Sequence, residues 1–352
     1  MTTIRDIARM TGVSVSTVSL ALSKPDRVGA KTLNKILAAA KEVGYVADPI
    51  ARGLASGRTQ LIGMVVADIS NPFFGALLKA VEGAAAARGY LVIMSDSGGL
   101  AAREREILDL LQAHRVAGIV LQSSDLSATN ARHLATLKMP LVLIDQKLDG
   151  IAADFVGTDN RLASAMLARH LLQLGHRRIG FVAGATGLFT SRERERGFVE
   201  TLEDAGVEID QSLIADGRYD GEEAYNVAMQ FLTRRDPPTA ILAANNVMAL
   251  GALQATFDLG FHCPDDISIA SIDDVPWSNV IAPRLTCALQ DPTRLGTLAA
   301  ERVLARIAAP ALQDSGPVDL IVPPQFKLGA SCRRLEAAPA AHDPIRSQAP
   351  TD

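Results

Sequence analysis

Short apolar runs alternate with helix-like segments from Leu61 onward, and this alternation constrains the fold more than any other feature of the sequence. The run 61–66 is followed by a polar loop, a helical segment to about Gly89 and a second run at 90–94. Runs of this length and composition are typical of strands buried in a parallel sheet. The pattern repeats at residues 118–121, 141–145, 178–182, 240–243 and 267–271. The sequence therefore predicts a doubly wound α/β fold for most of the chain.

Two of these units begin with nearly the same residues, Ile62-Gly-Met-Val and Ile179-Gly-Phe-Val. This internal similarity predicts two similar lobes. The chain has 352 residues, which is enough for two or three domains with buried cores. Two α/β lobes and one smaller domain fit within that length.

The smaller domain is expected in residues 1–47, where the pattern is helical. Thr3 with Asp6 three residues later is a helix start signal, and Ile4, Ile7 and Ala8 share one face of the helix that follows. Gly12 breaks this helix. Ser14 then caps a second helix, and a third helix follows.

The second helix has two distinct faces. Val18, Ala21 and Leu22 point inward with the first helix. The opposite face holds small, polar or aliphatic residues, namely Val15, Ser16, Ser19 and Leu20. This is helix-turn-helix geometry, in which the N-terminal end of the second helix contacts base edges. Many all-α domains also contain a helix, a turn and a helix, so this pattern alone leaves both interpretations open.

The distribution of charge favours the DNA interpretation. Residues 1–59 contain nine Lys or Arg and four Asp or Glu, whereas the remainder contains 26 basic and 35 acidic residues. A basic segment attached to an acidic body is typical of a protein that contacts phosphates through that segment.

The N-terminal motifs carry a family resemblance. Thr3-Ile-Arg-Asp-Ile-Ala, Thr11-Gly-Val-Ser-Val-Ser-Thr-Val-Ser and Asp48-Pro-Ile-Ala-Arg-Gly-Leu-Ala-Ser-Gly resemble the lactose-repressor/galactose-repressor (LacI/GalR) family of bacterial transcription regulators, and the resemblance runs to about Arg333. It implies an all-α helix-turn-helix headpiece at 1–47, a hinge helix and linker at 48–58, and a periplasmic-binding-protein-like core of two doubly wound lobes at 59–333 for effector binding and dimerisation.

The resemblance also divides the core and the tail. It implies an N-lobe at about 59–159 and 290–321 and a C-lobe at about 160–289 and 322–333, with crossings near Asp159, Gln290 and Val322. Residues 334–352 are rich in Ala, Pro and Gln without leucine heptads. We expect that tail to be disordered rather than a tetramerising coil.

The hinge helix is expected to enter the minor groove. Asp48 would be its N-cap, Pro49 its first residue and Gly57 its end. Leu54 falls on the family's wedge position, where leucines from two subunits open a central CpG step. The alternative for Leu54 is an ordinary buried leucine. The DNA-binding residues that we expect are Thr3, Val15, Ser16, Thr17, Ser19, Leu20, Arg52 and Leu54.

Several residues depart from the family pattern. Leu20 stands where the family usually has an arginine or histidine that reads the half-site, so specificity is expected to depend more on the wedge. Asp48 replaces an asparagine and places a carboxylate near phosphate. Asn246 replaces a common aspartate, and Gly329 stands where many members have an arginine.

Polar side chains follow the predicted strands, where open α/β sheets bind ligands. Carboxylates and amides suit hydroxyl groups, and Phe73, Phe74, Tyr219 and Trp277 offer faces for a sugar ring. The resemblance places Arg194, Tyr219, Asn245 and Asp273 at effector-binding positions. The effector-binding residues that we expect are Asp68, Asn71, Phe73, Asp145, Arg194, Tyr219, Asn245 and Asp273.

Three of these residues also have an alternative role that involves no ligand. Arg194 lies in the charge run Arg192-Glu-Arg-Glu-Arg, which is typical of a solvated helix face. We expect Arg194 to contact the ligand, with Arg192 and Arg196 solvated. Asp145 and Asp273 could each be a helix N-cap, a role compatible with ligand contact.

No catalytic or metal-binding pattern is present in the sequence. There is no GxGxxG after a strand, no Walker loop and no HExxH. Cys263, Cys287 and Cys332 are widely spaced without CxxC, which indicates inert thiols in a reducing cytoplasm. We therefore expect no enzyme activity, no cofactor and no metal.

The N-terminus has no apolar run of signal-peptide length, and no stretch approaches 18 uninterrupted apolar residues. We therefore expect a cytoplasmic protein without a membrane partner. The alternative function is a sugar-binding transport protein, which would need a signal peptide and has no use for residues 1–57.

The expected function is that of a ligand-responsive, sequence-specific transcriptional regulator, a repressor of carbohydrate-related genes. Its expected partners are a double-stranded, pseudo-palindromic DNA operator with a central CpG, a sugar or sugar derivative as effector, and a second copy of the chain in a homodimer. Whether the effector is an inducer or a co-repressor stays open.

Overall fold

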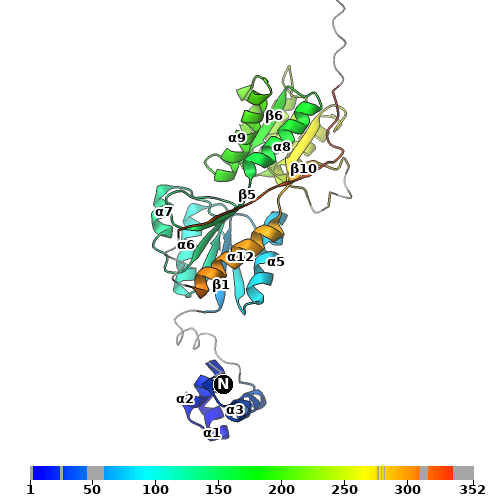
Figure 1. Cartoon of the computed structure of the whole chain (residues 1–352). Helices are drawn as coiled ribbons and strands as arrows, with labels where there is room; N and C mark the ends of the chain where they lie inside the picture. Colours follow the sequence, from blue (N-terminus) through cyan, green and yellow to red (C-terminus); the bar gives the residue numbers. More distant parts are fainter. Residues whose placement is uncertain are drawn as a thin grey trace, which may run out of the picture.

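The structure is a computed structural model that describes residues 3–23, 27–45, 59–275, 277–278, 280, 282–309 and 316–335. Arg52, Leu54 and the whole expected hinge at 48–58 lie outside the described residues, as do residues 336–352 of the tail. The described chain forms a three-helix headpiece and two α/β lobes (Figure 1). No helix in this part of the chain has the length and apolar character needed to cross a bilayer.

The headpiece consists of α1 (Ile4–Thr11), α2 (Val15–Ser23) and α3 (Ala30–Glu42). The backbone N–H and the hydroxyl of Thr3 both donate to an Asp6 carboxylate oxygen, at 2.9 and 2.8 Å. Gly12 ends α1 in the left-handed conformation with φ 66°, and the Ser14 hydroxyl accepts from the Thr17 N–H at 3.1 Å. The predicted start, break and cap are therefore confirmed.

One small hydrophobic core holds the three helices together. The inward faces predicted for α1 and α2 are confirmed, and α3 contributes the third side. The buried side chains of this core are Ile7, Ala8, Val18, Ala21, Ile36, Ala39 and Ala40.

The N-lobe is built on six parallel strands in the order β11-β5-β4-β3-β1-β2. These strands are β1 (Leu61–Val66), β2 (Leu91–Asp96), β3 (Gly118–Leu121), β4 (Leu141–Ile144), β5 (Asp154–Thr158) and β11 (Asp319–Val322). Helices α5 (Pro72–Ala86) and α12 (Pro292–Ala308) pack on one face, and α6 (Ala101–Ala113) and α7 (Ala128–Leu134) pack on the other (Figure 1).

The C-lobe is built on six strands in the order β12-β10-β9-β8-β6-β7. They are β6 (Ile179–Ala183), β7 (Ile214–Asp216), β8 (Ala240–Ala243), β9 (Ser268–Ile272), β10 (Thr286–Leu289) and β12 (Gln325–Lys327). Helix α8 (Asn160–Gln173) packs beside α9 (Phe189–Asp204), and α10 (Gly221–Leu232) packs beside α11 (Asn246–Asp258).

The chain passes between the two sheets three times, from β5 to α8, from β10 to α12 and from β11 to β12. The seven strands predicted from apolar runs are confirmed to within two residues. Five further strands, β5, β7, β10, β11 and β12, were not predicted. The expectation of parallel strands holds for the seven, but β12 pairs antiparallel with β10.

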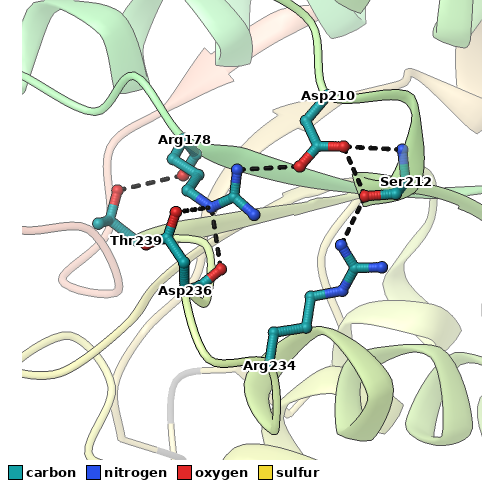
Figure 2. Close-up of polar contacts among 6 residues, drawn as sticks. All are labelled: Arg178, Asp210, Ser212, Arg234, Asp236 and Thr239. Carbon is teal, nitrogen blue, oxygen red and sulfur yellow. Dashed lines mark hydrogen bonds and ion pairs between the residues drawn. The ribbon is translucent and has the colours of Figure 1, made fainter.

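A polar network connects the loops at the N-terminal ends of β6 and β8 (Figure 2). Arg178 Nη1 donates to Asp210 Oδ2 at 2.9 Å, and its Nε donates to the backbone oxygen of Asp236 at 3.0 Å. The Thr239 N–H donates to the Arg178 carbonyl at 2.9 Å. These contacts lie at the end of the sheet opposite its carboxyl edge and fix the loops there.

A buried ion cluster closes the corresponding end of the N-lobe. Asp154 at the start of β5 is fully buried, and both of its oxygens accept from α12, at 2.8 Å from Arg302 Nη2 and 2.7 Å from Arg306 Nη2. Burial opposes ionisation of Asp154, but the hydrogen bonds from Arg306, Val318 N–H and Arg302 outweigh it and lower the pKa of this carboxyl. The cluster therefore holds α12 and β11 against β5.

Candidate functional site

Helix α2 presents the face that the sequence predicts. Val15 is 45% and Leu20 is 36% exposed, and Ser16 and Ser19 are also exposed. Thr17 is half-buried. The helix contains no charged residue and no Asn or Gln. Its surface therefore offers only hydroxyl and aliphatic groups to a partner.

Hydroxyl groups cluster at the start of α2. The Ser14 Oγ lies 2.7 Å from Ser16 Oγ and 2.7 Å from Thr17 Oγ1. Thr3 lies exposed at the start of α1, where its hydroxyl is already engaged by Asp6. These hydroxyls are held in place before any partner binds.

A cavity with a volume of about 460 Å³ lies between the lobes, at the carboxyl ends of strands from both sheets. We call it the interlobe cavity. All eight residues predicted for effector binding line it: Asp68, Asn71, Phe73, Asp145, Arg194, Tyr219, Asn245 and Asp273. Phe74 also lines it, but Trp277 does not and lies exposed on the loop after β9. The expectation that Trp277 offers a stacking face is therefore wrong.

Arg194 is 4% exposed and points inward from α9. Its Nε donates to Asn160 Oδ1 at 2.7 Å, and its Nη1 donates to the Ala244 carbonyl at 2.6 Å. Its Cζ lies 5.8 Å from the centre of the Tyr219 ring. The alternative of a solvated helix face is thus wrong for Arg194. Arg192 and Arg196 of the same charge run are exposed, as expected.

Asp145 and Asp273 occupy equivalent places, one after β4 and one after β9, with φ values of 63° and 62°. Burial raises the pKa of both carboxyls, while the nearby Arg194 guanidinium opposes that shift. Asp273 accepts from the Gln290 backbone N–H at 2.8 Å and from Gln290 Nε2 at 2.6 Å. Two carboxylates and one guanidinium therefore share a poorly solvated space.

The helix N-caps with side-chain hydrogen bonds at the cavity are Asn71, Asn245 and Asp220 rather than these two aspartates. Asn71 Oδ1 accepts from Phe73 N–H at 3.0 Å, and Asn245 Oδ1 accepts from Met248 N–H at 2.8 Å. The amide oxygens thereby fix the starts of α5 and α11 at the cavity wall. The N-cap role considered for Asp145 and Asp273 is wrong.

Sequence reasoning missed several neutral residues of the cavity, namely Gln122, Ser124, Gln146, Thr190 and Gln290. Gln146 Nε2 contacts Thr190 Oγ1 at 2.8 Å, and that hydroxyl lies 2.7 Å from the Tyr219 hydroxyl. Gln146 directly follows Asp145, and Thr190 lies one helical turn before Arg194. Proximity to the predicted residues was the only signal for either of them.

Chemistry other than binding finds no support in the described residues. No group of three or more His, Cys, Asp or Glu in this part of the chain is arranged to hold a metal ion. All three cysteines are free. Burial raises the pKa of Cys263 to about 12 and that of Cys332 to about 11, which matches the expectation of inert thiols.

Known proteins match both parts of the chain. Residues 3–48 match the family described as bacterial regulatory proteins, lacI family, and residues 168–332 match a periplasmic binding protein-like domain. The HTH-type transcriptional repressor PurR of Photobacterium profundum is 32% identical over 308 residues, which cover 87% of this chain and 92% of that protein.

Two solved structures extend the comparison. The lac repressor dimer bound to operator and the anti-inducer ONPF has a TM-score of 0.81 at 26% identity and covers 94% of this chain and 99% of its own. A LacI family transcriptional regulator from Enterococcus faecium with bound ribose has a TM-score of 0.70 at 26% identity and covers 78% of this chain and 100% of its own.

The geometry and the comparisons agree on the architecture, an N-terminal helix-turn-helix headpiece and a two-lobed, periplasmic-binding-protein-like core. Members of the matching family are repressors rather than enzymes. The chain belongs to the LacI family of bacterial transcription regulators and is a DNA-binding transcriptional repressor.

Proposed function

We propose that the chain is a ligand-responsive, cytoplasmic repressor of carbohydrate-related genes. In this proposal residues 1–47 read the operator, residues 48–58 form the hinge, and residues 59–333 bind the effector and dimerise. The single observation that carries the proposal is the interlobe cavity, which combines acidic, amide and aromatic side chains in a protein that has a DNA-binding headpiece.

The effector proposed is a sugar or a sugar derivative. Asp145, Asp273 and Asn245 supply oxygens and amides for paired hydroxyls, and Phe73 and Tyr219 supply ring faces. The bound ribose of the Enterococcus faecium regulator supports this class. Thermal-shift screening against neutral monosaccharides, disaccharides and nucleobases tests it, because stabilisation by nucleobases alone would overturn the sugar assignment.

The mechanism proposed is a change in the relative populations of two arrangements of the lobes. A ligand changes DNA affinity only through its different affinities for the two arrangements, so tight binding by itself regulates nothing. Removal of residues 1–58 tests the division of labour. Ligand binding should survive and operator binding should be lost, whereas operator binding by the truncated core would contradict the scheme.

A homodimer on a pseudo-palindromic operator is part of the proposal. Leu91 and Ile93 lie exposed at alternate positions of the edge strand β2, with Leu91 at 70% exposure. Two exposed apolar side chains on an edge strand are unusual, because such an edge favours association with another chain. Replacing both with lysine should convert the dimer to monomers in light scattering. A stable tetramer, or a monomer that saturates an operator one to one, would contradict the proposed assembly.

The hinge is proposed to read a central CpG step through Leu54, and Arg52 is proposed to contact the DNA as well. Leu54→Ala should then cost more specificity than Ser16→Ala, and inverting the CpG to GpC should weaken binding by about 1–3 kcal/mol. Binding-site selection with both variants tests this. The proposed roles would be wrong if Leu54→Ala kept its full preference for the central CpG step while Ser16→Ala no longer selected a consensus sequence.

A further inference from the structure

We propose that Val15 and Leu20 read the C5-methyl groups of two pyrimidines in each operator half-site. This inference rests on the proposed operator binding and names the chemical group that α2 recognises. The methyl group of thymine is the only apolar feature that a base pair presents in the major groove.

Helix α2 lacks the side chains that usually read bases. Arginine, lysine, asparagine, glutamine and acidic side chains make the bidentate or charged contacts that distinguish bases. The sequence of α2, Val-Ser-Thr-Val-Ser-Leu-Ala-Leu-Ser, contains none of them. Direct reading by this helix is therefore limited to hydroxyl contacts and apolar contacts.

The exposed face of α2 has hydroxyl groups in its middle and aliphatic side chains at its edges. At 3.6 residues per turn, Ser19 and Ser16 lie about 40° and 100° around the helix from Val15, and Leu20 lies about 140° from it. The two serines thus occupy the middle of the face and the two aliphatic side chains occupy its edges. Both aliphatic side chains are exposed in the free headpiece, so burial against DNA removes apolar surface from water.

The spacing of Val15 and Leu20 along α2 lets them reach different base pairs. Leu20 lies five positions after Val15, which corresponds to a rise of about 7.5 Å along the helix axis. Base pairs are stacked about 3.4 Å apart. With α2 lying along the groove, the two side chains meet base pairs about two steps apart, and the serine hydroxyls between them face phosphate oxygens or the polar groups of base edges.

The headpiece supplies the rest of the affinity without sequence information. Its seven basic residues within 1–47 attract any duplex, because phosphate contacts do not depend on sequence. The aliphatic pair therefore contributes discrimination, and Leu20 is a specificity-determining residue rather than a lost polar reader.

The test uses the full-length wild-type protein and removes single methyl groups from the DNA. The operator is first obtained by binding-site selection, and each thymine of the half-site is then replaced by deoxyuridine, which removes only the methyl group. Two replacements per half-site, about two base pairs apart, should each weaken binding about fourfold. Replacing the same thymine·adenine pair by 5-methylcytosine·guanine should retain more affinity than cytosine·guanine does.

Variants then assign each methyl group. Leu20→Ala should abolish the deoxyuridine effect at one position and Val15→Ala at the other. Leu37→Ala removes an exposed leucine from α3 and should leave both effects intact. A selected half-site whose affinity is insensitive to every thymine methyl would overturn the inference while leaving operator binding in place. Failure to select any DNA sequence would overturn the proposed function as well.

Discussion

Gln146 Nε2 donates a 2.8 Å hydrogen bond to Thr190 Oγ1, which connects the loop after β4 in the N-lobe to the start of α9 in the C-lobe. Beside it, the ring of Phe189 packs edge-on against Phe155 with centroids 5.6 Å apart. Gln146 and Thr190 both line the interlobe cavity, so a hydrogen bond that holds the lobes together also forms part of the wall of the proposed effector site.

Thr190→Val should loosen this connection. Valine keeps the shape of threonine but cannot accept from Gln146, and a hydrogen bond of this kind contributes about 1 kcal/mol. The population of the separated arrangement should rise about fivefold, and the radius of gyration from small-angle scattering should increase in the unliganded protein. Thr201→Val, which removes a hydroxyl bonded within α9 to the Gly197 carbonyl, is the matched control. Equal radii for the two variants would contradict the role of Thr190.

Arg194→Ala should abolish the effector response. If Arg194 contacts the ligand, its loss should weaken ligand binding by roughly 1.5–3 kcal/mol while operator affinity stays nearly unchanged. The loss of its bonds to Asn160 and Ala244 should also lower the melting temperature. Arg192→Ala, an exposed neighbour, should change neither property. Calorimetry with the stabilising sugar and an operator titration measure the two affinities, and unaltered ligand affinity in Arg194→Ala would remove this residue from the site.

Asp145→Asn should stabilise the unliganded protein at neutral pH and not at acidic pH. Burial raises the pKa of Asp145 in the folded chain above its ordinary value of 3.8, so folding favours the protonated form and wild-type stability falls as the pH rises through that interval. Asparagine does not titrate and accepts the positive φ of this position.

Melting temperatures measured between pH 4 and 7.5 check this prediction. The difference between Asp145→Asn and wild type should grow as the pH rises. Asp149→Asn, in the exposed loop that follows, should show no such trend. A difference that is constant with pH, or one that shrinks as the pH rises, would contradict the burial argument.

Asp154→Asn should be the more damaging of two ion-pair substitutions. Asp154 is fully buried between Arg302 and Arg306, and removing one partner of a buried cluster costs about 3–5 kcal/mol. Asp236→Asn, beside Arg178 at the surface (Figure 2), should cost about 1 kcal/mol or less. Urea unfolding measures both, and similar losses would contradict the difference in burial.

The pH dependence of the Asp154 contribution follows from its lowered pKa. The cluster stabilises the folded chain at any pH above the ordinary carboxyl value of 3.8. That stabilisation is lost as the pH falls through the lowered value, because Asp154 must then be protonated in the folded state. The gap between wild type and Asp154→Asn should therefore narrow in strong acid.

The elements that the sequence predicts well are those with strong local signals. Thr3, Asp6 and Gly12 mark the ends of α1 through cap chemistry, and the run Leu61–Val66 is buried almost throughout. Strand β5 was missed because it begins with the charged Asp154, which only its distant arginines make tolerable in the core. Strand β7 is a three-residue, half-buried edge strand, and an edge carries little apolar signal.

The sequence predicts eight of the residues that line the interlobe cavity but misses others, among them Gln146, Thr190, Arg218 and Asp220. Carboxylates at strand ends are conspicuous in a sequence. Gln146 and Thr190 have no such local signal, because they are buried by a contact between the two lobes. Trp277 shows the opposite error, since this aromatic residue follows a strand that ends at the cavity but lies exposed and does not line it. Contacts between lobes depend on sequence-distant packing that local patterns do not encode.

The most direct test of the account is the operator affinity of the full-length protein with and without the sugar that stabilises it best. Coupling between cavity and headpiece predicts a change of at least about fivefold in operator dissociation constant at saturating sugar, in either direction. Thermodynamic reciprocity requires operator DNA to change the sugar affinity by the same factor. Equal operator affinities with and without bound sugar would contradict ligand control of this repressor.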